Sequence, residues 1–188
     1  IGGYVLTCLG DNRTFSYLKS KSENSLSDKI ALQIINKKKN KKIYHWLQRG
    51  SDERQFNSPS VELNLGSFMR SKYETYNEYH TSEDKLGSFV NKKSLNQSFQ
   101  LLTEVILKFE SSIIPFSKII CEPHLSKRNL YSHINIKGLN RKKAQTILDF
   151  LSYSNGELLL EEIAKKISIN LYEARKLYFF LKKKNLLE

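Results

Sequence analysis

A change in hydrophobic period divides the sequence into two parts near residue 114. In the first part, short alternating segments are interleaved with longer segments of helical period, which is the pattern of strands and helices in an α/β layer fold. Beyond Gly138 only helical periods remain. The sequence therefore predicts an α/β domain over 1–114, a connector over 115–138 and a small helical domain over 139–188.

The first part carries both strand and helix signals. The predicted strands cover residues 1–9, 14–18, 43–47 and 61–69; the second of these could also be an extended edge. The predicted helices cover residues 25–35 and 94–109. The apolar residues of the second helix recur at helical spacing and are expected to face the core: Leu95, Phe99, Leu102, Val105, Ile106 and Phe109. A polar, tyrosine-rich loop is expected over 73–86.

The second part has the helix-turn-helix pattern. Its predicted helices cover residues 140–153, 158–167 and 171–184, and a three-residue turn, Ser168-Ile169-Asn170, precedes the last helix. A short turn before a third helix is typical of DNA-binding helix-turn-helix units. The residues after Asn185 leave room for one short strand, too little for a full wing hairpin.

The composition excludes several classes of protein. The 188 residues are 39% hydrophobic and 27% charged, as in soluble globular proteins. No apolar run is long enough to span a bilayer, so no membrane association is expected. Cys8 and Cys121 are too few for a disulfide framework, which favours a reducing cytoplasm. The net charge of +12 is spread evenly and rich in lysine, so nucleic-acid binding is possible in principle but is not favoured.

The sequence begins with an apolar segment from Ile1 to Leu6. It lacks the basic n-region and the long apolar h-region of a signal peptide. The segment is typical of the inside of a strand. We therefore expect the chain to be a piece of a longer protein, cut within a folded domain just before the strand at Tyr4.

Four histidines are the first candidates for chemistry. His45, His124 and His133 are interpreted as structural or surface residues. His80 differs because it lies in a loop that follows a predicted core strand, where α/β sheets bind ligands. A neutral imidazole is a common zinc ligand, and a nearby carboxylate such as Asp84 can orient it. One histidine does not make a zinc site, and no HExxH motif is present.

A second polar cluster, Ser51-Asp52-Glu53-Arg54, also follows a predicted strand. Adjacent acids beside an arginine usually form a solvated turn. They could also bind a charged substrate group, because arginine matches carboxylates and acids match an amine. Both interpretations stay open on the residues alone.

Three segments together resemble a known family: Gly50 to Phe56, Leu65 to Arg70 and Glu78 to Leu86. In this order they resemble bacterial zinc aminopeptidase-like proteins, which are often associated with polysaccharide biosynthesis and carry a C-terminal winged-helix domain. These proteins are relatives of the co-catalytic zinc exopeptidases. The resemblance implies the C-terminal part of a zinc-exopeptidase-like α/β sandwich followed by a winged-helix-like domain.

The resemblance implies roles for particular residues. His80 matches the last zinc ligand of the exopeptidases. Asp52 matches a carboxylate that lines or supports the substrate pocket. At the next position the family usually has a histidine, and this chain has Glu53. The resemblance groups Glu53, Arg54 and Asp84 with Asp52 as substrate-binding or supporting residues. Thr7 stands where classical members carry an aspartate ligand, and a neutral hydroxyl is a poor zinc ligand, so one zinc ion, or a ligand set shifted toward Asp11, is expected in place of a full two-zinc site. The other ligands and the general base are expected upstream of Ile1.

The implied activity is zinc-dependent hydrolysis of N-terminal peptide bonds, with one or two zinc ions in the longer protein and a peptide or amino-acyl substrate. The isolated chain is expected to be inactive and to bind zinc weakly. Two alternatives remain. One is a catalytically degraded binding protein in surface-polysaccharide assembly, which Thr7 favours. The other is a DNA-binding regulator acting through the C-terminal helices. The sequence leaves open whether the protein forms a homo-oligomer.

Overall fold

The computed structural model describes residues 2–128, 130 and 139–188. It divides into two compact units, Ile1–Ser111 and Ser112–Glu188, which we call unit 1 and unit 2. His133 and much of the predicted connector over 115–138 lie outside the described residues. None of the described helices is long and apolar enough to cross a bilayer.

Unit 1 is built on a four-stranded mixed sheet with the strand order β1-β4-β2-β3. The strands are β1 (Tyr4–Leu6), β2 (Phe15–Leu18), β3 (Lys41–Tyr44) and β4 (Gly66–Met69). β1 runs parallel to β4, β2 runs parallel to β3, and β2 runs antiparallel to β4. β1 and β4 therefore end at the same edge of the sheet at which β2 and β3 begin. We call this edge the carboxyl edge.

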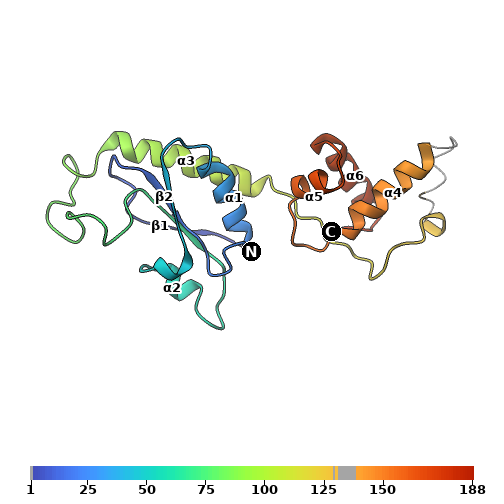
Figure 1. The fold of residues 1–188 in the computed structure, drawn as a ribbon, viewed down its shortest axis with the longest axis horizontal. Coiled ribbons are helices and arrows are strands. Elements are labelled where there is room, and N and C mark those ends of the chain that lie inside the picture. The colour runs from blue at the N-terminus through green and yellow to red at the C-terminus, as the bar shows by residue number, and fades with distance from the viewer. Residues whose placement is uncertain (1, 129, 131–138) are drawn as a thin grey trace. The chain divides into compact units, whose positions relative to one another are not determined.

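Helices α1 (Leu26–Ile35) and α3 (Lys92–Glu110) cover one face of the sheet (Figure 1). The core on this face includes Tyr17 and Phe68, which are opposite each other in the ladder, packed against helix residues such as Ile34. The Tyr17 ring crosses β4 at Gly66, where any side chain would collide with the tyrosine hydroxyl. Glycine is therefore required at this position.

The opposite face carries the alternate strand residues Ser16, Leu18, Ser67 and Met69, and we call it the loop face. Tyr73 packs there against Leu18 and Met69. The segment between β3 and β4 contains a 3₁₀ turn, η1 (Trp46–Gln48), and a short helix, α2 (Glu53–Phe56). Loops and short helices thus cover this face.

Unit 2 is helical, with α4 (Leu139–Ser152), α5 (Leu160–Lys166) and α6 (Leu171–Lys183), preceded by a 3₁₀ turn, η2 (Leu125–Arg128). Phe150, Ile163 and Leu181 lie at the centre of its core and are fully buried. Single antiparallel bridges join Phe116 to Asn155 and Ser117 to Leu187. The predicted α/β class and the three C-terminal helices are therefore confirmed, while Leu187 forms a single bridge in place of the short strand for which the sequence leaves room.

Three details of the sequence prediction are wrong. The strand expected over 61–69 is limited to β4, and residues 46–47 belong to η1. The helix at Glu53 was not expected. The buried side of α3 is predicted only in part. Val105 is buried and Leu102 and Phe109 pack against the core. Leu95, Phe99 and Ile106, in contrast, are 41%, 68% and 56% exposed.

The side of α3 that packs inward carries small residues together with apolar ones. Its buried residues are Ser94, Ser98, Leu101 and Val105. The Ser98 hydroxyl donates to the carbonyl oxygen of Leu9 over 2.8 Å, so the helix approaches the turn after β1 closely. Large side chains at positions 94 and 98 would prevent this approach, which is why the stripe with fewer apolar residues is the buried one.

Candidate functional site

Two segments meet at the carboxyl edge of the sheet: the turn that follows β1 and the chain that follows β4. The buried Asp11 carboxylate joins them. It accepts hydrogen bonds from the Arg13 amide at 2.7 Å and from the amide and hydroxyl of Ser71 at 3.0 and 3.2 Å. The edge therefore has a fixed backbone from which the loop with His80 departs.

Glu53 is the most constrained of the predicted site residues. Its carboxylate is 0% exposed and accepts four hydrogen bonds. The amides of Gly50 and Ser51 each donate over 2.9 Å, the Ser67 hydroxyl over 3.0 Å and the Tyr73 hydroxyl over 2.8 Å. A carboxylate has about four lone-pair positions, so Glu53 is saturated. It ties the loop before α2 to β4 and to the chain that follows β4.

These contacts also determine the charge of Glu53. Burial alone raises the pKa of a carboxyl group, because it disfavours the charged form. Here the hydrogen bonds from the amides of Ser51 and Gly50 and from Tyr73 outweigh burial, and the pKa of Glu53 lies below its usual value. The side chain is therefore an ionised anchor at neutral pH.

Asp52 and Arg54 flank this anchor and are exposed. The Asp52 carbonyl accepts the amide of Gln55 at 3.0 Å, at the beginning of α2. The Arg54 Nε donates to the carbonyl oxygen of Ser51 at 3.3 Å. With Glu53 held inside, both charged side chains face solvent, where they can contact a ligand.

His80 lies on the loop after β4 and is exposed, with a left-handed backbone φ of 58°. Its ring stacks on that of Tyr79 with the centroids 3.9 Å apart. Asp84 is exposed as well. The Tyr76 hydroxyl lies 3.5 Å from Asp84 Oδ2 and 3.3 Å from Cys8 Sγ. Tyr76 thus connects the loop to the end of β1, next to Thr7.

The predicted residues form two groups. Asp52, Glu53 and Arg54 belong to the α2 loop, and His80 and Asp84 belong to the loop after β4. The Glu53–Tyr73 hydrogen bond connects the two loops at their bases. Among the described residues, no hydrogen bond or ion pair joins His80 to Asp84 or either of them to Asp52, and no three His, Cys, Asp or Glu side chains are grouped as metal ligands. The described residues therefore do not fit a zinc ion by themselves.

Sequence reasoning missed Tyr73 and Tyr76, which hold these loops. It considered Asp11 only as an alternative metal ligand, whereas the Asp11 carboxylate is buried and accepts hydrogen bonds from Arg13 and Ser71. Burial and the neighbouring Cys8 raise the pKa of Tyr76, and burial and Glu53 raise that of Tyr73. Both phenols are therefore protonated donors at neutral pH. The available signal was the recurrence of tyrosine in a loop that is otherwise polar.

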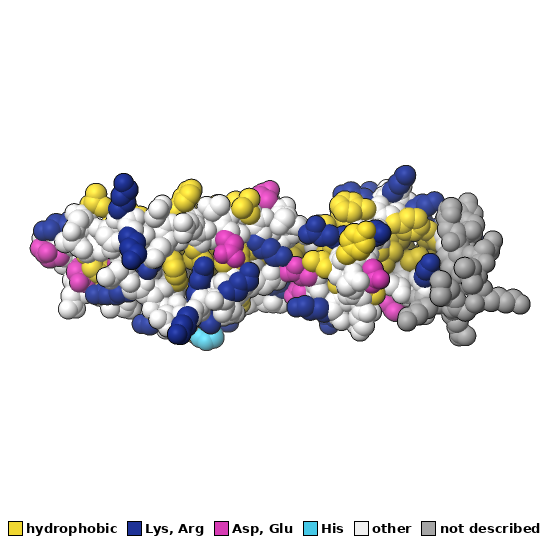
Figure 2. Space-filling model, turned by 90° about the horizontal axis from the view of Figure 1, so that it is seen from above, with side chains coloured by type: hydrophobic (Ala, Val, Ile, Leu, Met, Phe, Trp, Pro, Cys, Tyr) yellow, Lys and Arg dark blue, Asp and Glu magenta, His cyan; other side chains and the backbone are white. Residues whose placement is uncertain are grey.

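A DNA-binding role of unit 2 would use basic residues of its last helix. These residues, Arg175, Lys176 and Lys182–Lys184, are exposed on or just after α6. Lys176 lies over the Tyr172 ring at 4.3 Å. Figure 2 shows lysine and arginine side chains scattered over the face in view, among apolar and acidic ones, rather than gathered in one patch.

Comparison with known proteins gives two family matches. Residues 1–112 match a domain of unknown function, DUF4910, and residues 115–188 match a winged helix-turn-helix. The second match agrees with the three helices of unit 2.

A protein of Clostridium acetobutylicum is 37% identical over 134 residues, which are 70% of this chain and 30% of that protein. Its name describes a polysaccharide biosynthesis protein with an aminopeptidase-like domain. A crystal structure of a protein described as a peptidase, from the same organism, aligns over 100% of this chain and 41% of its own with a TM-score of 0.59 and 29% identity. The chain thus spans less than half of either relative.

Proposed function

The chain belongs to the DUF4910 family, and on that premise we propose that unit 1 forms one wall of an aminopeptidase-like active site. In this proposal His80 is a metal ligand, the exposed Asp52 and Arg54 contact the charged groups of a peptide or amino-acyl substrate, and Glu53 is a positioning residue. The remaining ligands and the general base belong to parts of the protein outside the described residues.

The observation that carries the proposal is the connection between the two polar loops. Glu53 binds Tyr73 and thereby joins the α2 loop to the chain after β4. Tyr76 joins the same chain to Cys8 at the end of β1. The chain that leads from β4 to His80 is therefore attached at two points, to Glu53 of the α2 loop and to Cys8 after β1, and the imidazole itself is exposed. The name of the Clostridium acetobutylicum relative, which describes an aminopeptidase-like domain, also supports the proposal.

Zinc, when bound, would polarise the substrate carbonyl and lower the pKa of a bound water to about 7. Unit 1 would contribute one imidazole to it, with Asp84 available to orient the ligand loop through Tyr76. Asp52 would attract the substrate amine and Arg54 a substrate carboxylate. These roles use only charges that the structure leaves exposed.

The test is hydrolysis of leucine p-nitroanilide by the complete polypeptide that the gene encodes. His80→Ala is expected to lower kcat/KM by at least about a hundredfold, as loss of a metal ligand does. His45→Ala is the matched control, because His45 is an exposed histidine of the same unit whose ring contacts Glu23. Equal activity of the two variants would remove His80 from the site.

A second test uses the 188-residue chain itself. We expect weak zinc binding, because a single imidazole among the described residues gives low affinity. Calorimetric titration with zinc measures this directly. Tight binding at one ion per chain would show that the chain holds a ligand set of its own.

The alternative of a non-catalytic binding protein makes a different prediction. The same scaffold would bind a peptide or amino-acyl ligand without hydrolysing it, and the neutral Thr7 hydroxyl next to Cys8 agrees with this, because it is a poor zinc ligand. If the complete protein still binds the ligand after its zinc has been removed, that result would favour the non-catalytic alternative. A gel-shift assay with unit 2 addresses the DNA-binding alternative, which requires a steep dependence on salt.

A further inference from the structure

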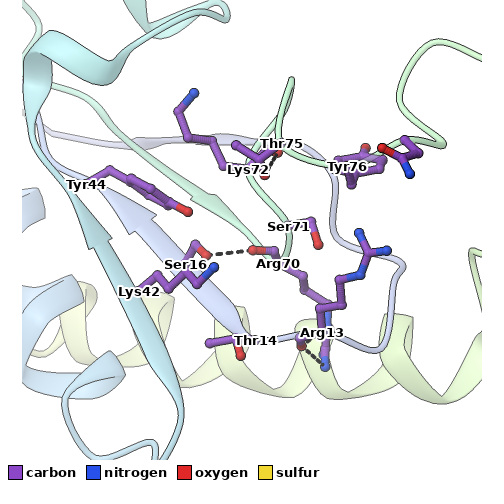
Figure 3. Close-up of a pocket in the computed structure, with 11 residues that line it drawn as sticks. Arg13, Thr14, Ser16, Lys42, Tyr44, Arg70, Ser71, Lys72, Thr75 and Tyr76 are labelled. Atoms are coloured by element: carbon purple, nitrogen blue, oxygen red, sulfur yellow. Dashed lines mark hydrogen bonds between the residues drawn. The ribbon is translucent and has the colours of Figure 1, made fainter.

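A cavity of about 310 Å³ opens on the loop face at the carboxyl edge (Figure 3). Ser16 and Lys42 are paired across β2 and β3, and Tyr44 lies two residues further along β3 on the same face. Arg13 and Tyr76 form the opposite side in Figure 3. This volume lies at the lower end of the range of small-ligand pockets, about 300–1,000 Å³.

The charge of the cavity lining is positive. Arg13, Lys42, Arg70 and Lys72 line it, and no aspartate or glutamate does. Arg13 forms a long ion pair of 3.4 Å with Glu78. In the described part of the chain, Lys42 and Lys72 form no ion pair; the Lys72 ammonium lies over the Tyr73 ring at 4.2 Å.

Arg70 does not contribute its charge to the cavity directly. Its guanidinium donates to the carbonyl oxygen of Arg13 at 2.8 and 3.2 Å, towards α3. The Asp11 carboxylate lies close by, but it is buried and occupied by Arg13 and Ser71 donors. The accessible charges are therefore those of Arg13, Lys42 and Lys72.

Most hydroxyls of the lining already donate their hydrogen elsewhere. Ser16 donates to the Arg70 carbonyl at 2.6 Å, Thr75 to the Lys72 carbonyl at 2.6 Å and Ser71 to Asp11 at 3.2 Å. The Tyr44 hydroxyl points into the cavity in Figure 3, and together with the ammonium groups it gives an excess of donors. Such a lining favours a ligand group that only accepts hydrogen bonds.

We propose that this cavity binds the oxyanion group, phosphate or carboxylate, of a small ligand. Lys42 and Tyr44 would donate from β3, while Arg13 and Lys72 would supply charge from the turn after β1 and the chain after β4. None of these four residues is among the site residues that the sequence predicted on the α2 loop and on the loop after β4. The inference therefore goes beyond the peptidase-like proposal and does not depend on it.

The test is isothermal titration of the full chain at low ionic strength, in separate runs with inorganic phosphate and with acetate. Lys42→Gln is expected to weaken binding about tenfold, because one charge-assisted hydrogen bond is lost. Lys39→Gln removes the same charge three residues away, at an exposed position outside the cavity, and is expected to leave the affinity within about twofold. Unchanged Trp46 fluorescence confirms that both variants are folded.

Each outcome decides the proposal. Binding of phosphate alone, or of acetate alone, that depends on Lys42 supports it and identifies the source of the oxyanion. Lys42-dependent binding of both probes supports a general oxyanion site. Equal weakening in the two variants would show non-specific attraction to a basic surface, and no binding of either probe at tens of millimolar would equally overturn the proposal.

Discussion

The two units stabilise their interiors in different ways. The buried side chains of unit 1 include four charged residues, Asp11, Asp28, Glu53 and Arg70. In the described part of unit 2, Ser154 is the one buried side chain outside the apolar set, and the core is otherwise made of residues such as Phe150 and Leu181. The contrast follows from architecture, because unit 1 must hold long loops and unit 2 has short turns between helices.

Asp28 shows how a buried carboxylate organises unit 1. It accepts hydrogen bonds from the Tyr17 hydroxyl at 2.9 Å, from the Ser20 amide at 2.8 Å and from the Ser25 amide at 3.0 Å. The last contact completes the capping box of α1. One carboxylate thus joins a core strand, a turn and a helix terminus.

The difference teaches where a site can form. Burying apolar area does not specify the path of a polar loop, whereas a saturated carboxylate fixes several backbone amides at once. Unit 1 has two such anchors: Asp11 lies next to the carboxyl edge, and Glu53 lies on the loop face near the beginning of β4, where it bonds Ser67. The chain that leads to His80 thus begins at residues fixed by these anchors, Ser71 and Tyr73, while His80 itself is exposed and stacks on Tyr79.

The largest effect is expected from removing the Glu53 anchor. Glu53→Ala removes the acceptor of four hydrogen bonds and leaves the buried hydroxyls of Ser67 and Tyr73 without a partner, so we expect unit 1 to lose about 3–5 kcal/mol of stability. Trp46, the only tryptophan, reports unfolding of unit 1 by fluorescence in urea. The control is Glu62→Ala, since Glu62 forms an exposed ion pair with Lys21, and it should cost less than about 1 kcal/mol. Similar shifts for both variants would contradict the anchor role.

Unit 2 should respond most to the loss of apolar packing. Leu181→Ala removes a fully buried side chain of α6 and is expected to cost about 2–5 kcal/mol. Ellipticity at 222 nm during urea unfolding measures it. Phe179→Ala is the control on the same helix, because Phe179 is 59% exposed. If Leu181→Ala leaves the stability of unit 2 unchanged, the statement that apolar packing stabilises the interior of unit 2 is contradicted.

Acid should affect unit 1 in a graded way. The pKa of Glu23 is lowered from 4.5 to about 2, chiefly by its hydrogen bond with His45, and that of Glu53 is lowered as well. A lowered folded-state pKa gives stability that is present above the unfolded value and is lost as pH falls. Trp46 unfolding midpoints should therefore decrease between pH about 4.5 and 2.

The acid experiment also has an internal comparison. The core of unit 2 contains no buried carboxylate among the described residues. Its helical ellipticity should persist after the Trp46 signal has begun to change. Simultaneous loss of both signals would argue that buried charge does not distinguish the units.

The smallest effect is expected at the buried serine of unit 2. The Ser154 hydroxyl donates to the carbonyl oxygen of Phe150 at 2.7 Å. Ser154→Ala should cost about 0.5–1.5 kcal/mol, the net value of one neutral hydrogen bond. Ser152→Ala, which removes an exposed contact to the Asp149 carbonyl, is the control in thermal unfolding. If Ser154→Ala lowers stability as much as Glu53→Ala does, buried polar groups would matter equally in the two units, and the contrast between them would be contradicted.

Sequence reasoning was most successful where hydrophobic period and core coincide. The helices of unit 2 and α1 with its Ser25 cap were predicted, because caps and apolar stripes are local signals. The N-terminal half of α3 shows the limit, because Leu95 and Phe99 were expected to face the core and are exposed. Ser94 and Ser98 are buried because the helix approaches Leu9, and this contact joins residues 89 positions apart.

The site shows the same limit in another form. The motifs directed attention to Glu53 and His80, but nothing local indicated that Glu53 points inward to Ser67 and Tyr73 while its neighbours Asp52 and Arg54 are exposed. The cavity beside Lys42 was not predicted either. It depends on the register of β2 against β3, which places Ser16 opposite Lys42.

The central claim is that the anchored loops present His80 as a metal ligand. The most direct measurement is the zinc content per chain of the complete protein after gel filtration, for the wild type, His80→Ala and His45→Ala. We predict that the wild type and His45→Ala retain the same amount of zinc, while His80→Ala loses at least one ion. Equal zinc content in all three proteins would contradict the claim.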